Sequence, residues 1–132
     1  MINQQLRGLP GFHGCYHYQR LAQVLWQGLQ GWFIVYVEEH WVGLFVQDKT
    51  IIVLETLGRE KGHLDLLCDE LPDYWVYANR HQLQSVWSEA CGFYCILFVQ
   101  CRISSLCDFD QFLSWFSTRQ LALNDVLLYN LL

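Results

Sequence analysis

The sequence predicts a single domain of the α+β class, and three observations support this prediction. The chain has 132 residues, 53% hydrophobic and 16% charged, which suffices to bury one core and is too short for two. Short runs rich in β-branched and aromatic residues gather in the middle of the chain, between segments with helical spacing. No repeat, low-complexity segment or linker divides the sequence, so residues 1–132 are expected to form one unit. This pattern is typical of a central mixed sheet with helices around it, one of them buried.

The first helix is expected in the segment CYHYQRLAQVLWQGL, which begins at Cys15. Leu21, Leu25 and Leu29 recur there at helical spacing, and glycines follow near the predicted end at about Gln30.

The predicted sheet consists of three consecutive runs and one later run. The turn-like QDK between the second and third runs predicts a β-hairpin. The runs are WFIVYVE (Trp32–Glu38), HWVGLFV (His40–Val46), TIIVLE (Thr50–Glu55) and YWVYA (Tyr74–Ala78).

Four further helices are expected from apolar spacing. The first has leucines on one stripe and is stopped by Pro72, and the second is apolar on nearly all sides and should run through the centre of the protein. Their expected ranges are Arg59–Leu71, Ser88–Cys101, Phe109–Ser117 and Leu121–Tyr129.

Composition argues against several classes of protein. The net charge is −5, and the two lysines and six arginines form no cluster, so nucleic acid is not an expected partner. The uncharged run from Ala90 to Cys101 has 12 residues, short of the ~20 of a membrane-spanning helix. No basic segment followed by an apolar core appears at the N-terminus, so we expect a soluble, intracellular protein whose six cysteines are reduced.

Cys91 is the first candidate for chemistry. With Ser88 as the expected N-cap, Cys91 falls in the first helical turn, where free backbone N–H groups and the helix dipole favour a thiolate. Gly92 removes a side chain beside the sulfur and leaves room for a substrate backbone. The alternative is that Cys91 is simply a small core residue, as most buried cysteines are.

Three polar residues complete a candidate catalytic site. His40 begins one predicted strand and Glu55 ends the next, so a hairpin would bring a base and an orienting carboxylate together. Gln84, seven residues before Cys91, offers an amide N–H₂ that could stabilise an oxyanion together with the Cys91 backbone N–H. Each of these residues alone is equally compatible with an ordinary structural or surface role.

The order and spacing of these elements resemble the adenovirus-type cysteine endopeptidases, the adenain family, which are related to the proteases that process ubiquitin-like modifiers. The resemblance rests on HW at His40, LETLG around Glu55, and QSVWSEACG from Gln84 to Gly92, and it extends over about Leu9 to Val99. Glutamate at the acid position is similar to adenain, whereas the ubiquitin-like proteases usually have aspartate.

The resemblance implies a papain-like or adenain-like fold and a function. Cys91 would be the nucleophile, His40 the general base, Glu55 its orienting acid and Gln84 the oxyanion donor of a thiol protease (hydrolase). Trp41 would pack beside the histidine. The enzyme would be a viral or virus-like cysteine endopeptidase that cleaves capsid or core precursors during virion maturation, located in the host nucleus or the virion.

The same resemblance also raises the question of partners and leaves two alternative functions open. The segment before Gln84 has no cysteine, so an activating peptide would have no obvious disulfide anchor, and an acidic chain offers little surface for DNA. We expect no cofactor. The alternatives are a deconjugating protease for ubiquitin or ubiquitin-like proteins, and a catalytically inactive interaction module of the same fold.

A metal site is a competing interpretation of a different segment. His13, Cys15 and His17 alternate, so in an extended strand they would point to one side. Structural zinc generally needs two closely spaced ligand pairs, and no Cys-x-x-Cys pair or obvious fourth ligand exists, so no metal is expected.

Overall fold

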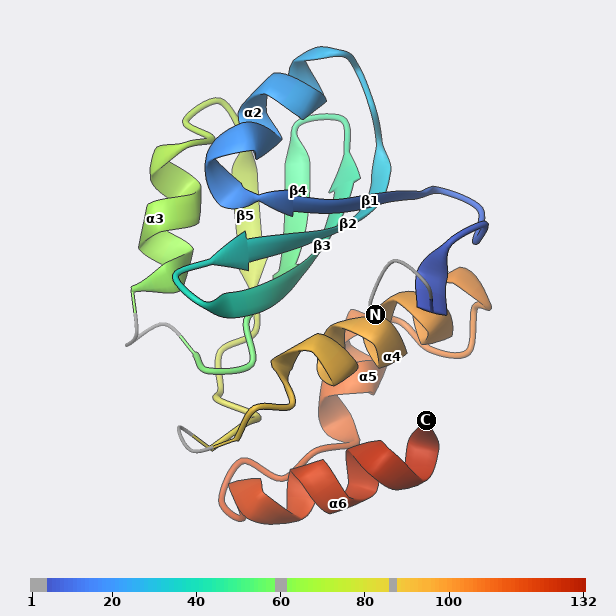
Figure 1. Ribbon diagram of the computed structural model, residues 1–132. Coiled ribbons are helices and arrows are strands. Elements are labelled where there is room, and N and C mark those ends of the chain that lie inside the picture. Colours follow the sequence, from blue (N-terminus) through green and yellow to red (C-terminus); the bar gives the residue numbers. More distant parts are fainter. Residues whose placement is uncertain (1–4, 59–61, 86–87) are drawn as a thin grey trace.

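A five-stranded mixed sheet separates two groups of helices in the computed structural model, which describes residues 5–58, 62–85 and 88–132 (Figure 1). The strands lie in the order β1-β2-β3-β4-β5, the same order as in the sequence. The outer pairs, β1 with β2 and β4 with β5, are parallel, and the two inner pairs are antiparallel. The strands are β1 Phe12–His17, β2 Gly31–Val37, β3 His40–Gln47, β4 Thr50–Leu54 and β5 Trp75–Ala78.

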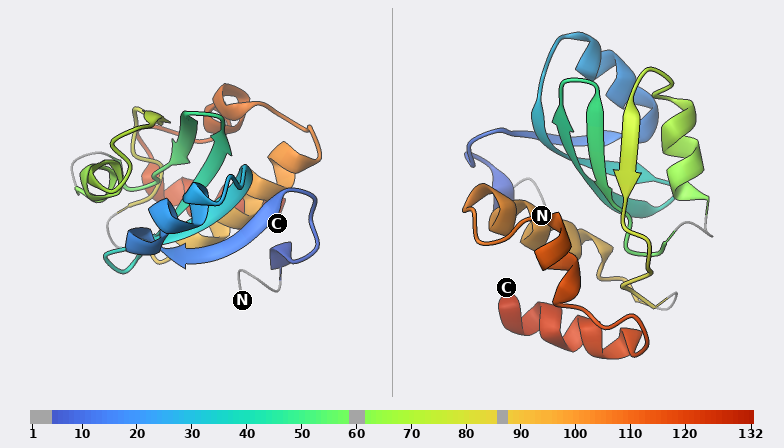
Figure 2. Two further views of the ribbon diagram at one scale, coloured as in Figure 1. Left: turned by 90° about the horizontal axis from the view of Figure 1, so that it is seen from above. Right: turned by 180° about the vertical axis from the view of Figure 1, so that it is seen from behind.

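The helices cover both faces of this sheet. Helices α2 (Tyr18–Trp26) and α3 (His63–Asp69) pack on one face, and α4 (Cys91–Ile103) packs on the other (Figure 2). Helices α5 (Phe109–Ser114) and α6 (Leu121–Leu131) both lie against α4, and α6 lies on the side of α4 away from the sheet (Figure 1). None of the helices in the described ranges is long and apolar enough to cross a lipid bilayer.

Strand β2 shows why the middle of the chain is hydrophobic without interruption. Trp32 and Ile34 join the core beneath α4, whereas Phe33 and Val35 join the core beneath α2 and α3. Side chains of a strand alternate between faces, so a sheet buried on both sides needs apolar residues at every position.

A close approach between α4 and β3 depends on Gly43. A Cβ atom at this position would lie 3.2 Å from Cδ2 of Phe98 and 3.6 Å from Sγ of Cys95, both on α4. The missing side chain therefore allows the buried helix to press directly on the centre of the sheet.

A two-residue turn joins β2 to β3. Its residues, Glu38 and Glu39, have φ values of 48° and 65°, the left-handed conformation that suits tight β-hairpins and that glutamate adopts at a cost. The turn places His40 at the first position of β3.

The predicted fold class is confirmed: the chain is α+β, with a mixed sheet and a buried helix, consistent with a papain-like or adenain-like fold. The four predicted strands and the hairpin around the QDK turn are also present.

Several predicted helix boundaries were wrong. Cys15 to His17 belong to β1, because this segment pairs in parallel with β2, and the helix begins only at Tyr18 after a cap from the His17 ring to the backbone N–H of Gln19. Helix α4 begins at Cys91 rather than Ser88, since Ala90 occupies the N-cap position.

Three other helices also differ in length from the prediction. Helix α3 covers His63–Asp69, and residues 59–61 of the predicted helix lie outside the described residues. Helix α5 ends at Ser114, earlier than Ser117, and α6 continues to Leu131.

Candidate active site

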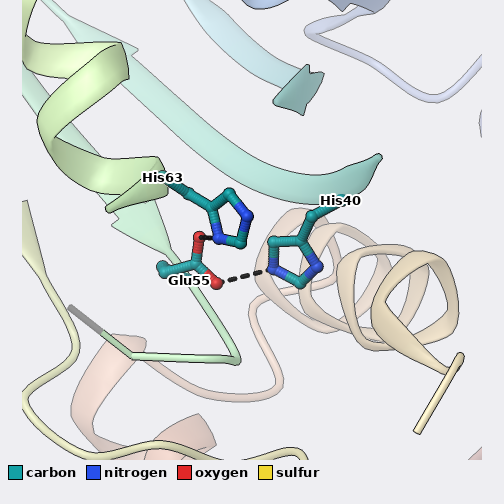
Figure 3. Close-up of side chains that lie close together, drawn as sticks. All are labelled: His40, Glu55 and His63. Carbon is teal, nitrogen blue, oxygen red and sulfur yellow. Dashed lines mark hydrogen bonds and ion pairs between the residues drawn. The ribbon is translucent and has the colours of Figure 1, made fainter. Parts of the chain in front are cut away.

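His40 and Glu55 meet where two antiparallel strands end side by side. His40 is the first residue of β3 and Glu55 directly follows β4, whose Leu54 pairs with Gly43. The Nε2 atom of His40 lies 2.6 Å from Oε1 of Glu55 (Figure 3). Both residues are buried, with exposed fractions of 4% and 1%, so this contact operates away from bulk water.

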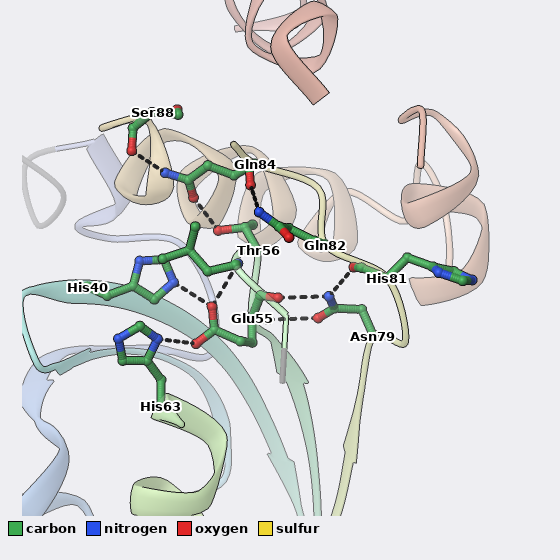
Figure 4. Close-up of polar contacts among 10 residues, drawn as sticks. His40, Glu55, Thr56, His63, Asn79, His81, Gln82, Gln84 and Ser88 are labelled. Carbon is green, nitrogen blue, oxygen red and sulfur yellow. Dashed lines mark hydrogen bonds and ion pairs between the residues drawn. The ribbon is translucent and has the colours of Figure 1, made fainter. Parts of the chain in front are cut away.

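The position of Glu55 is fixed by further hydrogen bonds. The backbone N–H of Leu57 donates to Oε1 at 2.9 Å. The side chain of Asn79, just after β5, accepts from the Glu55 N–H and donates to the Glu55 carbonyl, both at 2.8 Å (Figure 4). The strand end that carries the carboxylate is therefore held from both sides.

Cys91 approaches this pair from the other layer of the fold, as the first residue of α4. Burial acts to raise the pKa of its thiol. The hydrogen bond with His40, the backbone N–H groups of Trp41 and Gly92 and the charge on His40 outweigh burial and lower the pKa below the ordinary 9.0. Since Nε2 of His40 is engaged by Glu55, Nδ1 is the ring nitrogen left for the sulfur.

The histidine shows the complementary shift. Burial acts to lower its pKa, but hydrogen bonds to Cys91 and Glu55 and the charges of both groups raise the pKa of His40 from 6.5 to about 9. A lowered thiol pKa next to a raised imidazole pKa favours a thiolate–imidazolium pair at neutral pH.

Other cysteines lack this environment. Burial raises the pKa of the thiol of Cys95, one helical turn after Cys91, well above 9.0, and burial also raises the pKa values of Cys15, Cys101 and Cys107. None of the six cysteines, all of which lie in the described ranges, forms a disulfide. Cys91 therefore differs from these four cysteines in the direction of its pKa shift because it lies beside His40, and not because it is buried in an apolar helix.

Gln84 is buried in the loop between β5 and α4 and has a defined orientation. Its Oε1 accepts a hydrogen bond from the hydroxyl of Thr56, and its Nε2 donates to the carbonyl of Ser88 at 2.8 Å (Figure 4). These bonds establish which end of the amide carries the nitrogen, and they leave the second N–H of that group for another acceptor.

The C-terminal helix holds the same loop. Asn124 of α6 donates to the carbonyl of Leu83 at 2.7 Å, and Asp125 accepts from the hydroxyl of Ser88 at 2.7 Å and from that of Tyr94 at 2.9 Å. Thus α6, although it lies on the outer side of α4, positions the residues on either side of Gln84.

The Trp41 side chain forms its ring contact with Tyr36, at 4.8 Å between centroids. Its contribution to the site comes from the backbone, through the N–H that faces Cys91.

His63 is part of this cluster, and the sequence analysis missed it. Its Nδ1 lies 3.3 Å from Oε2 of Glu55, and its ring stacks on that of His40 with centroids 4.8 Å apart (Figure 3). The only available signal was a histidine at the start of a helix that follows the acid by eight residues.

Two groups of residues carry side chains that can ligate a metal ion. His13, Cys15 and His17 do not converge, since His13 contacts the carbonyl of Gln30 and His17 caps α2. The ligand atoms of His40, Glu55 and His63 do lie within 4.8 Å of one another. However, the His40–Glu55 contact is as short as a charge-assisted hydrogen bond, so a proton and not a metal ion accounts for this arrangement.

Comparison with known proteins gives a likeness at the level of the fold alone. No family model matches the chain, and no curated protein is similar enough to count as a relative. Among solved structures, AvrA, determined as a delL154 variant with IP6 and CoA, matches with a TM-score of 0.55 and 17% sequence identity. The match covers 80% of this chain and 48% of AvrA, so this chain spans about half of that protein's length.

A likeness at this identity shows the fold alone. It supports a distant relationship in architecture, and it does not specifically support the adenain family.

Proposed function

We propose that this chain is a cysteine endopeptidase that uses Cys91, His40 and Glu55 as its catalytic groups. The observation that carries the proposal is the convergence of these groups: His40 is hydrogen-bonded to the buried carboxylate of Glu55, and the interaction of Cys91 with His40 lowers the pKa of the thiol. Nucleophile, base and orienting acid in contact are the arrangement that thiol-dependent acyl transfer requires.

The first half-reaction follows from the positions of these groups. The Cys91 thiolate attacks the carbonyl carbon of a peptide bond, and the carbonyl oxygen becomes an oxyanion. When this intermediate collapses, the C–N bond breaks, the imidazolium of His40 gives its proton to the leaving amine, and a thioester to Cys91 remains.

The second half-reaction restores the enzyme. Neutral His40 takes a proton from water, the resulting hydroxide attacks the thioester, and the C–S bond breaks to release the acid and the Cys91 thiolate. Glu55 keeps Nδ1 of His40 directed at the sulfur and stabilises the imidazolium in both steps. Gln84 would serve the oxyanion with the N–H that Ser88 does not use, together with the Cys91 backbone N–H.

The substrate side of the proposal comes from the resemblance in sequence. An adenain-type enzyme would act on viral capsid or core precursors, at segments with small residues. A ubiquitin-type deconjugating protease would use the same catalytic groups on a Gly-Gly terminus. A ubiquitin-vinyl-type probe and a library of precursor-like peptides separate the two, because each reports on one substrate class.

Acyl transfer from a thioester is a second candidate function. The observation in its favour is that AvrA was solved with CoA, and a cysteine thiolate that attacks peptide carbonyls is also suited to attack an acyl-CoA thioester. Incubation with radiolabelled acetyl-CoA tests this candidate, with formation of a thioester on Cys91 as the expected result and an unlabelled protein as the result against it.

The decisive experiment compares two cysteines on the same helix. Cys91→Ser should abolish cleavage of library peptides and fast alkylation by iodoacetamide, whereas Cys95→Ala, one turn further along, should leave both unchanged because the Cys95 thiol is buried and protonated. Cleavage that persists in Cys91→Ser would refute the proposal. Intact fast alkylation without cleavage of any peptide would instead remove the endopeptidase assignment and leave deconjugation, acyl transfer and a non-catalytic module as candidates.

A further inference from the structure

One oxygen of the buried Glu55 carboxylate has a single candidate donor. Oε1 is used by His40 and by the backbone of Leu57, whereas Oε2 has no conventional hydrogen bond within the described residues. Nδ1 of His63 lies 3.3 Å from this oxygen and likewise has no hydrogen bond within the described residues. Two buried polar atoms that lie close together and have no other hydrogen-bond partner in the described residues are expected to pair, since leaving both unpaired costs free energy of folding.

The His63 ring also has a defined relation to His40. The two rings stack at an interplanar angle of 26°, and both direct a nitrogen toward the same carboxylate, one toward each oxygen (Figure 3). Because His63 begins α3 while His40 begins β3, the carboxylate connects a helix and a strand that are separate in the sequence.

We propose that His63 is a positioning residue of the catalytic site. As a neutral imidazole it donates Nδ1–H to Oε2 of Glu55 while its ring backs the ring of His40. The carboxylate is thereby fixed at both oxygens, and His40 keeps one orientation toward Cys91. This inference rests on the proposed function. It adds a fourth residue to the series of interacting side chains, which then runs in the order Cys91, His40, Glu55, His63.

The proposed role requires His63 to be uncharged while His40 carries the proton. The groups that face His63 are Glu55 on the β4 end, His40 on β3 and Glu38 in the turn between β2 and β3. Burial and the charge of His40 lower the pKa of His63 below 6.5, against the two glutamates, so the ring is neutral at pH 7. A proton gained by His63 at lower pH would place two stacked cations on one carboxylate and weaken the hold of Glu55 on His40.

Two substitutions separate hydrogen bonding from packing. His63→Asn keeps an amide N–H close to the position of Nδ1 but loses the ring and cannot titrate, whereas His63→Leu keeps apolar bulk behind His40 but cannot donate. His81→Asn is the matched control, because its ring is exposed and points away from Glu55 (Figure 4). Each protein is measured for kcat, KM and the pH profile on a library-derived peptide, and for the rate of Cys91 alkylation, after circular dichroism confirms folding.

The expected result is a kcat about tenfold lower in His63→Leu with an unchanged KM, and a kcat within about threefold of the unsubstituted protein in His63→Asn. The acidic limb of the His63→Asn profile should move to lower pH, because the residue that charges there is gone. Equal kcat in all proteins, or a larger loss in His63→Asn than in His63→Leu, would overturn the inference.

The alkylation rates distinguish this failure from failure of the proposed function. If His63→Leu slows alkylation of Cys91 although no peptide is cleaved, the role of His63 stands and the peptidase assignment falls. If peptides are cleaved and alkylation is the same in all variants, the assignment stands and the role of His63 falls.

Discussion

Replacement of Glu55 by glutamine tests how much the buried carboxylate contributes to the reactivity of Cys91. Glutamine keeps the size and one carbonyl oxygen, but it removes the negative charge 2.6 Å from the His40 ring. The pKa of His40 of about 9, against an ordinary 6.5, corresponds to a preference of about 3 kcal/mol for the imidazolium. Cys91 and Glu55 share in this preference, and if half belongs to Glu55, its loss is worth about 1 to 2 kcal/mol, or about tenfold in the ratio of imidazolium to imidazole.

The assay is the rate of iodoacetamide alkylation of Cys91 across pH. The unsubstituted protein should react at a nearly constant rate down to the lowered pKa of Cys91. Glu55→Gln should react more slowly near pH 7, by up to about tenfold, and approach the same rate above about pH 9, where the thiol ionises without help. Asp108→Asn is the control, since it removes a carboxylate charge at the α5 N-cap and keeps a capping oxygen.

Unfolding by urea provides a second measurement on the same variant. Since folding raises the pKa of His40, protonation of this residue stabilises the fold fully below about pH 6.5, and this stabilisation is lost as the pH rises through about 9. The stability deficit of Glu55→Gln should therefore be largest on the acidic side of this window. Identical alkylation profiles, together with a pH-independent difference in stability, would refute the claim that Glu55 acts on Cys91 through the charge of His40.

Three further substitutions test the supports of the site. Thr56→Val leaves Oε1 of Gln84 buried without its donor, so we expect the free energy of unfolding in urea to fall by about 1–3 kcal/mol and turnover to fall with it. Thr56→Ser keeps the hydroxyl and should keep both stability and turnover. Asn79→Ala removes the side chain that bonds both backbone groups of Glu55, and about 3 kcal/mol of stability should disappear, while an unchanged urea midpoint would contradict this role. Glu39→Gly relieves a left-handed glutamate in the turn before β3, so thermal unfolding should show a gain of about 1 kcal/mol, and a lower melting temperature would argue against strain there.

Local sequence patterns predicted the centre of the fold well. Strands β2, β3 and β4 are consecutive, rich in β-branched and aromatic residues and joined by tight turns, so their register follows from neighbouring residues alone. Because these strands are consecutive and joined by tight turns, the sequence also placed His40 and Glu55 at adjacent strand ends. The second half of β1, from Cys15, was misread as helix because it pairs in parallel with β2, and parallel pairing leaves no hairpin signal in the sequence.

The remainder of the site depends on contacts between distant segments. His63 reaches Glu55 only because α3 packs on the sheet face below β4, and Asn79 reaches it only because β5 adds to the sheet beside β4. Neither residue stands in a pattern of its own, and a single histidine or asparagine near a helix or strand end is common in any protein. Their roles follow from tertiary geometry, which single-sequence reasoning does not supply.

Gly43 has a consequence for the reacting atoms, although it touches neither of them. The sulfur belongs to the helical layer and the imidazole to the sheet, so the gap between sulfur and ring is set by the thickness of the packing between α4 and β3. A residue with no side chain keeps that thickness at its minimum. Even one added methyl group at this point, three residues along β3 from His40, would push α4 away from the sheet and lengthen the distance over which a proton must pass.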